Sequence, residues 1–196
     1  QQKAKLLQSK IAQYITVDSK TNKEDLKLEI DDLKWDLIEA TLEERDETDK
    51  LGEIKKLRKD RVKPFFIWKL EFGKVFKNNG GFDVVIGNPP YVNTKDIAKY
   101  NWRSSLASEF GWVDDLYNHF THLALTLSKS KGIISFITSD TFFTIQSKSN
   151  MRKLLLENEI IHIIPTPKAF SAMVDTAIFI VKKNRNSCNY LLEFSD

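Results

Sequence analysis

The sequence is poor in cysteine, in net charge and in long apolar runs. Its single thiol, Cys188, cannot form a disulfide within the chain, which fits a reducing cytoplasm. No apolar stretch approaches the roughly 18 residues of a membrane-spanning helix, and the amino terminus has no apolar signal-peptide core. The formal net charge is only +3, so contacts with nucleic acid would have to come from local patches. We therefore expect a cytoplasmic protein without a membrane segment.

Proline and glycine are nearly absent from the first third of the chain. Residues 1–63 contain no proline and a single glycine, Gly52, and are dense in Lys, Glu, Asp and Leu. Apolar side chains recur there at steps of three and four, which is the helical period, and a shorter helix around residues 3–15 precedes them. We predict a solvated helical hairpin over 1–63, set before a second domain at 64–196. The periodic positions are Leu26, Ile30, Leu33, Leu37, Ile38 and Leu42.

Two features of this charged region have a functional and a plain interpretation. The basic run at residues 55–59 could contact DNA phosphates, or it could be the exposed face of a helix. Asp46 or Asp49, together with Glu53 and Lys55, mimics the acidic pattern of a metal-dependent nuclease. That pattern requires a strand, whereas these residues lie in a helix-like stretch, so we expect no metal site.

After Pro64 the sequence changes to short apolar runs that alternate with helical segments. Helices are predicted at 115–129 and 148–157, and strands at 83–87, 132–138, 160–164 and 176–182. Such alternation predicts an α/β sandwich with a mainly parallel sheet. In such sheets ligands bind beyond the carboxyl ends of the strands.

The most informative motif, Asn88-Pro89-Pro90-Tyr91, follows the first of these strands. The prolines fix their φ angles and donate no backbone N–H, so nearby carbonyls remain available as acceptors. An amide oxygen and a proline carbonyl could therefore accept both N–H bonds of an exocyclic amine, while Tyr91 stacks on its ring. The alternative is an ordinary turn at the end of a strand, since Asn-Pro is a common turn dipeptide.

This motif and its entering strand, residues 82–87, resemble the N6-adenine DNA methyltransferases that use S-adenosylmethionine. The resemblance is strongest to the methyltransferase part of single-chain type II restriction–modification enzymes, and it covers about residues 64–183. The approach from Trp68 to Asp83 is similar as well. The resemblance implies the C-terminal half of a Rossmann-like methyltransferase sheet, preceded by a helical hairpin insertion. It also implies methyl transfer to N6 of an adenine flipped out of double-stranded DNA.

The same resemblance assigns roles to residues. Asn88, Pro89, Pro90 and Tyr91 would form the catalytic motif. Pro90 would also contact the cofactor, together with Leu116 and Phe120 from the segment Asp115-Leu116-Tyr117-Asn118-His119-Phe120. Leu116 and Phe120, four residues apart on one helical face, would line the pocket for the cofactor's adenine. Equally, such a pair is common in a plain apolar core.

Two further segments match the family. Phe170 corresponds to an aromatic residue that packs against the flipped adenine opposite Tyr91, although it could simply cap the core. The turn Thr138-Ser139-Asp140 would contact substrate or shape the pocket.

One departure from the family pattern concerns the cofactor. The seven glycines, at 52, 73, 80, 81, 87, 111 and 132, form no Gly-x-Gly loop, and three strands expected before residue 64 are missing. The chain therefore resembles a piece of a longer polypeptide, without the N-terminal half and the specificity domain. Alone it is expected to bind S-adenosylmethionine weakly or not at all, and to be inactive.

Two alternatives to a DNA methyltransferase remain open. Protein glutamine N5-methyltransferases share the Asn-Pro-Pro-Tyr loop, because a side-chain amide presents the same NH2 geometry. The chain could also be a catalytically incomplete fragment whose helical hairpin binds a partner or DNA.

Overall fold

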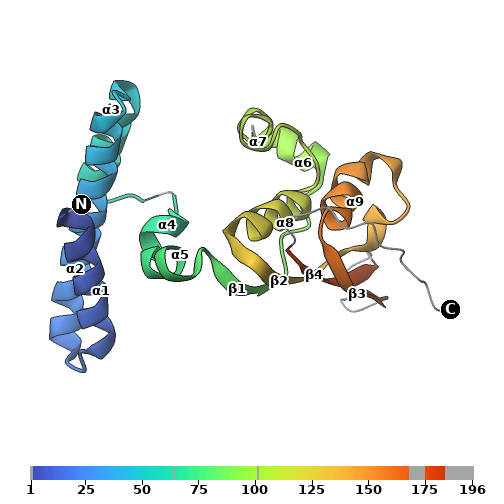
Figure 1. Ribbon diagram of the computed structural model, residues 1–196. Coiled ribbons are helices and arrows are strands. Elements are labelled where there is room, and N and C mark those ends of the chain that lie inside the picture. Colours follow the sequence, from blue (N-terminus) through green and yellow to red (C-terminus); the bar gives the residue numbers. More distant parts are fainter. Residues whose placement is uncertain (1, 64, 101, 168–174, 184–196) are drawn as a thin grey trace. The chain divides into compact units, whose positions relative to one another are not determined.

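The computed structural model describes residues 2–63, 65–100, 102–167 and 175–183 (Figure 1). The chain forms two compact units, residues 1–74 and 75–196, and each is described by itself. No helix within the described ranges is long and apolar enough to cross a membrane. Those ranges also contain no group of three His, Cys, Asp or Glu side chains placed to hold a metal ion.

The first unit is built from helices α1 (Gln2–Thr16), α2 (Lys20–Glu44), α3 (Thr48–Lys59) and α4 (Trp68–Glu71). Two ion pairs show that α1 and α2 run antiparallel. Lys3 near the start of α1 pairs with Asp36 at 3.0 Å, and Lys10 further along pairs with Glu29 at 2.5 Å. The predicted helical hairpin is therefore confirmed. Its buried apolar side chains are Leu7, Ile30 and Trp35.

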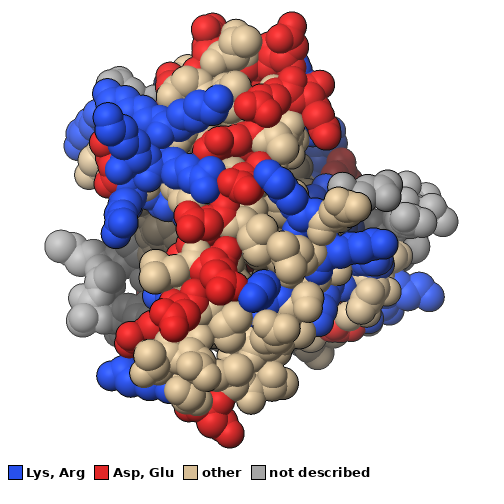
Figure 2. Space-filling view, turned by 90° about the vertical axis from the view of Figure 1, so that its left-hand side faces the viewer, with Lys and Arg blue, Asp and Glu red and all other residues tan. Residues whose placement is uncertain are grey.

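The basic run lies on α3, as the interpretation of an exposed helix face expects. Arg58 is nevertheless engaged by α2, since its Nη1 donates to Asp36 at 2.9 Å and to Glu39 at 3.0 Å. The hydrogen bonds from Lys3 and then Arg58 hold the pKa of Asp36 below its usual value. Over the face shown in Figure 2, patches of basic and acidic side chains alternate. Part of the positive charge of α3 is thus matched within the unit.

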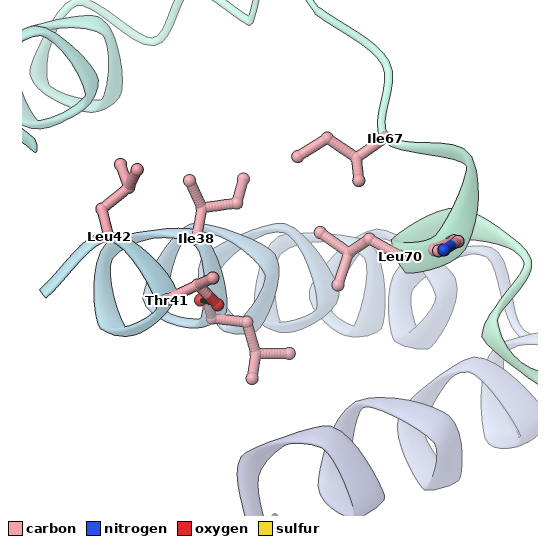
Figure 3. Close-up of a pocket in the computed structure, with 7 residues that line it drawn as sticks. Ile38, Thr41, Leu42, Ile67 and Leu70 are labelled. Carbon is pink, nitrogen blue, oxygen red and sulfur yellow. Dashed lines mark hydrogen bonds between the residues drawn. The ribbon is translucent and has the colours of Figure 1, made fainter. Parts of the chain in front are cut away.

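The first unit extends past Pro64, where the composition changes. The ring of Phe65 meets Trp35 of α2 edge to face, at 5.6 Å between centroids, and Glu71 of α4 pairs with Lys34 of α2 at 2.5 Å. Residues 65–72 therefore pack against α2 and join the helical unit. A shallow apolar groove of about 360 Å³ lies between the two segments (Figure 3). Its lining residues are Leu37, Ile38, Thr41, Leu42, Ile67, Lys69 and Leu70.

The second unit contains one sheet. Its strands are β1 (Phe82–Gly87), β2 (Ser128–Ser139), β3 (Glu159–Thr166) and β4 (Thr176–Lys182), in the order β1-β2-β4-β3. All four lie where the sequence predicts strands. The β1–β2 pair is parallel, but β4 runs antiparallel to both β2 and β3. Strands β1, β2 and β3 of this sheet therefore point in the same direction and β4 opposes them, so most strands are parallel as expected, although two of the three neighbouring pairs are antiparallel.

Helices α8 (Leu116–Leu127) and α9 (Ser149–Leu156) pack on one face of this sheet. Helix α5 (Gly73–Asn79), which begins in the first unit, precedes β1, and α6 (Thr94–Lys99) and α7 (Arg103–Phe110) lie beyond α8 (Figure 1). Two 3₁₀ turns, η1 (Asp140–Phe142) and η2 (Gln146–Lys148), lead into α9. The core lies between α8, α9 and the sheet, and comprises Ala124, Leu125, Ile134, Phe136, Phe142, Met151, Leu155, Phe179 and Val181. The expected α/β fold class is confirmed.

The opposite face of β1 is open. Side chains alternate between the faces of a strand, so Val85 packs against the core while its neighbours point away. Val84 is 57% exposed and Ile86 is 79% exposed.

Gly81, immediately before β1, offers a test of how closely the start of β1 packs against the end of α8. Its φ is +147°, and a Cβ there would lie 2.5 Å from the carbonyl oxygen of Leu127. We expect Gly81→Ala to destabilise the sheet unit by about 3 kcal/mol, because strained backbone and overpacking add. Gly52→Ala is the matched control, since a Cβ in α3 meets nothing within 4 Å, and it should stabilise by about 0.5–1 kcal/mol. Urea unfolding followed by circular dichroism measures both, and equal effects would contradict the packing described.

Candidate functional site

The Asn88–Tyr91 loop leaves β1 at the edge where two parallel strands end. Gly87, the last residue of β1, pairs with Phe136 of β2, so the loop lies at the carboxyl end of both strands. Asn88 and Pro90 are exposed, Pro89 is buried and Tyr91 is half-buried. The loop is therefore anchored through one proline and presents the Asn88 amide to solvent.

Tyr91 is held from two sides. Its hydroxyl donates to the carbonyl oxygen of Ile137 in β2 at 3.2 Å, and its ring meets Tyr117 of α8 edge to face at 6.5 Å. Burial raises the pKa of the Tyr91 hydroxyl, so this side chain is a neutral donor at physiological pH. The orientation of its ring is set before any ligand arrives.

The segment after Tyr91 is tied to the beginning of α8. Asp115, at the N-cap of α8, accepts hydrogen bonds from the backbone N–H of Thr94 at 2.9 Å and from its hydroxyl at 3.0 Å. The backbone N–H of Leu116 donates to the carbonyl of Val92 at 2.8 Å. The loop is thus fixed to the helix that carries the second sequence motif.

A buried lysine completes this connection. Lys148, at the end of η2, pairs with Asp114 at 2.5 Å and with Asp115 at 2.7 Å. The Lys148 side chain is only 8% exposed. Burial lowers its pKa, but the hydrogen bonds to Asp114 and Asp115 outweigh that effect and leave the pKa above its usual value. Lys148 is therefore charged at neutral pH and connects the start of α9 to the start of α8.

His119 supports the same turn. Its ring stacks on Trp112 at 4.3 Å and 17°, and its Nε2 accepts the backbone N–H of Asp114 at 3.1 Å. Burial lowers the pKa of His119, against the opposing effect of the Asp114 carboxylate. The imidazole is therefore neutral, as an acceptor at Nε2 must be.

Leu116 and Phe120 lie together on the outward side of α8. Leu116 is half-buried and Phe120 is 40% exposed, whereas Tyr117 and Thr121, on the adjoining side of the helix, are buried. Phe120 is therefore not part of the enclosed core, and its assigned contact with cofactor stays a prediction.

The turn at 138–140 is connected to α8 through hydroxyl groups. Ser139 contacts the Thr141 hydroxyl at 2.9 Å, and Thr141 contacts the Tyr117 hydroxyl at 3.3 Å. Thr138 is fully buried. The structure thus brings this turn near Tyr117, on which Tyr91 packs, while Phe170 lies outside the described residues.

Sequence reasoning missed the ion pairs of Asp114 and Asp115. The adjacent carboxylates at the start of an amphipathic helix were a visible signal of an N-cap. Lys148 gave no signal, because its partners lie more than thirty residues earlier and helical spacing does not relate them.

Comparison with known proteins defines the class and then the family. Several relatives that match carry the name of a type II methyltransferase, and one of them that of a combined restriction enzyme and methyltransferase. Residues 3–170 match the model of the Eco57I restriction-modification methylase family, and the chain belongs to that family. The resemblance drawn from the Asn88–Tyr91 motif is therefore confirmed.

The match to each relative covers only part of that relative's length. A type II restriction enzyme and methyltransferase of Methanocaldococcus jannaschii, RM.MjaORFECS2P, is 34% identical over 129 residues, which is 63% of this chain and 10% of that protein. The type II methyltransferase M.XamI of Xanthomonas campestris pv. amaranthicola is 32% identical over 108 residues, which is 50% of this chain and 20% of that protein. The chain thus spans between a tenth and a fifth of these two relatives.

A solved structure was also found. It is a class I S-adenosylmethionine-dependent methyltransferase from Listeria monocytogenes, with a TM-score of 0.44 and 20% identity. The match covers 58% of this chain and 35% of that one.

Replacement of Lys148 tests the buried ion pairs. We expect Lys148→Met to destabilise the sheet unit by about 3 kcal/mol, because it leaves two largely buried carboxylates without a counter-charge. Lys153→Met on the exposed side of α9, where the contact with Glu157 is 4.0 Å, should change stability by less than about 0.5 kcal/mol. Urea unfolding followed by tryptophan fluorescence provides the measurement. An effect of Lys148→Met as small as that of Lys153→Met would show that the pairs do not hold the turn.

His119 predicts a pH dependence of stability. Its pKa is lower in the folded than in the unfolded chain, so its contribution is fully present above about pH 6.5 and is lost as the pH falls through the lower, folded value. Stability should therefore decrease between pH 7.5 and 5.5, and His119→Gln should remove that component. His162→Gln, on the exposed side of β3, should leave the decrease as in the parent. Urea titrations at both pH values would contradict this if His119→Gln retained the full decrease.

Proposed function

We propose that the polypeptide carrying this chain is the DNA methyltransferase of a restriction–modification system, and that it methylates N6 of adenine in double-stranded DNA. The observation that carries the proposal is the Asn88 amide, exposed on a proline-stiffened loop beside a tyrosine ring fixed by β2 and α8. The family supports methylation, and the loop chemistry supports an exocyclic amine as the acceptor.

The target adenine has to leave the base stack, because its N6 atom is unreachable inside the duplex. Unpairing costs a few kcal/mol, and stacking on aromatic rings offsets about 1–3 kcal/mol per base. Tyr91 supplies one such ring. Its ordering costs no further conformational entropy, because its hydroxyl is already bound to β2 and its ring already contacts Tyr117. Phe170 is proposed as the second ring, on the other side of the base.

The amine of adenine is a weak nucleophile, because its lone pair is delocalised into the ring. The Asn88 side-chain oxygen and the Pro89 carbonyl would accept its two N–H bonds and draw the nitrogen towards tetrahedral geometry. Attack on the methyl group then depends on alignment of the reacting atoms more than on a strong base. None of the three histidines lies in the loop.

S-adenosylmethionine, when bound, supplies an electrophilic methyl group. The described residues fit one part of it, since Leu116 and Phe120 present an apolar, partly open side of α8 that suits its adenine. Pro90, exposed in the loop, would contact it beside the reacting atoms. The chain contains no Gly-x-Gly loop to hold the rest of the cofactor. We therefore assign binding of the rest of the cofactor to another region of the polypeptide, and we assign recognition of the DNA sequence to another region as well.

Replacement of Asn88 tests the proposal directly. In the polypeptide that carries this chain, Asn88→Ala should reduce methylation of plasmid DNA by about a hundredfold or more, since it removes an acceptor that positions the amine. Asn93→Ser is the matched control, because Asn93 caps α6 by accepting from the backbone of Lys95 and Asp96 and serine caps equally well. Tritium transfer from labelled S-adenosylmethionine measures both variants.

Three outcomes would count against the proposal. Normal methylation by Asn88→Ala would remove Asn88 from the mechanism. Transfer to a glutamine-containing release factor, with none to DNA, would indicate a protein methyltransferase. Transfer to cytosine would retain the enzyme class and reject the adenine assignment.

A further inference from the structure

Two aromatic side chains between α6 and α7 stack on each other in the open. The rings of Tyr100 and Trp102 lie 4.8 Å apart with an angle of 23°. Tyr100 is 60% exposed and Trp102 is 43% exposed. Large aromatic side chains usually bury most of their surface, as Phe136 and Phe179 do in the core of this unit. The exposed pair therefore marks a surface built for contact.

Basic residues flank this aromatic pair in the sequence. Lys95 and Lys99 precede it on α6, and Arg103 follows it directly as the first residue of α7. Lys99 is paired with Asp96 at 2.6 Å. Within the described ranges of the chain, no carboxylate pairs with Lys95 or Arg103. Proteins that bind single-stranded nucleic acid combine exposed aromatic rings, which stack on bases, with positive charges, which contact the phosphates.

The pair is held at a defined place relative to the Asn88–Tyr91 loop. Ile97 of α6 is fully buried, and Thr94, where α6 begins, is bound to Asp115. In Figure 1, α6 and α7 lie beyond α8, on the side away from the strands. The aromatic pair therefore follows a helix, α6, that is fixed to the rest of the unit and begins three residues after Tyr91.

We propose that Tyr100 and Trp102 bind DNA next to the target base. Their open ring faces stack on a neighbouring base that loses its own stacking partner when the adenine leaves the helix. Lys95 and Arg103 take the adjoining phosphates. The inference rests on the proposed function and adds to it a contact surface outside the catalytic loop.

Photochemical cross-linking tests the contact. Trypsin cleaves after Lys99 and Arg103, so it releases Tyr100-Asn101-Trp102-Arg103 as a single peptide. A short single-stranded oligonucleotide containing 5-iodouracil, irradiated with the polypeptide that carries this chain, should give an adduct on that peptide. An adduct only on peptides outside residues 94–110 would overturn the inference.

Binding measurements provide a second test in the same polypeptide. The double variant Tyr100→Ala/Trp102→Ala should weaken binding to a DNA duplex about tenfold, the loss expected for one stacked base. Phe66→Ala is the control, because Phe66 is also an exposed aromatic residue, at 54%, and lies in the helical unit. Lys95→Ala or Arg103→Ala should each reduce the dependence of log affinity on log salt by about 0.9.

The outcomes separate this inference from the proposed function. If the double variant binds duplex DNA as tightly as the parent, the inference fails, even where Asn88→Ala abolishes methylation as expected. If the double variant loses affinity and the adduct forms while Asn88→Ala methylates normally, the contact surface stands and the catalytic assignment falls. A parent polypeptide that shows neither DNA binding nor an adduct overturns the inference.

Discussion

The arrangement of the candidate site depends on one buried cation between two carboxylates. Lys148 holds Asp114 and Asp115 in a largely water-excluded position, where losing a single partner is far more costly than breaking a surface pair. Asp115 in turn binds the segment that follows the Asn88–Tyr91 loop. Three chain segments far apart in sequence are thereby joined at one point, and the loop is fixed at both ends, by β1 before it and by this cluster after it.

The support of the loop suits chemistry that proceeds by alignment. Tyr91 is fixed by a hydrogen bond to β2 and by an edge contact with Tyr117, so a base that stacks on it meets a surface already in place. Asn88 is exposed, and its side chain makes no hydrogen bond within the described part of the chain. The residue proposed to accept from the substrate is thus the one whose hydrogen-bonding groups face solvent, while its neighbours provide rigidity.

The sequence located the strands well, and for a physical reason. Apolar runs bounded by Gly81, Gly87 and Gly132 define strands locally, and the stiffness of Asn88–Tyr91 is a property of its own residues. The antiparallel direction of β4 could not be read from its own residues, because the direction of a strand depends on the connection that precedes it and not on the strand's composition. Helices α6 and α7 are short and were missed. The link from Lys148 to Asp114 could not be foreseen, since tertiary packing alone brings them together.

The composition changes at Pro64, but residues 65–72 pack against α2, and the compact helical unit extends to Lys74. The division into an insertion and a catalytic domain remains a prediction.

The open side of β1 has a consequence for handling the chain in the laboratory. Within the described residues, β1 has one hydrogen-bonded neighbour strand, β2, so the other edge of residues 83–87 has no strand partner there and lies beside the exposed side chains of Val84 and Ile86. A bare, apolar edge strand is a template for pairing with another molecule. Preparations limited to these residues will therefore tend to self-associate through β1, and a charged substitution such as Ile86→Lys is the direct means of keeping them monomeric.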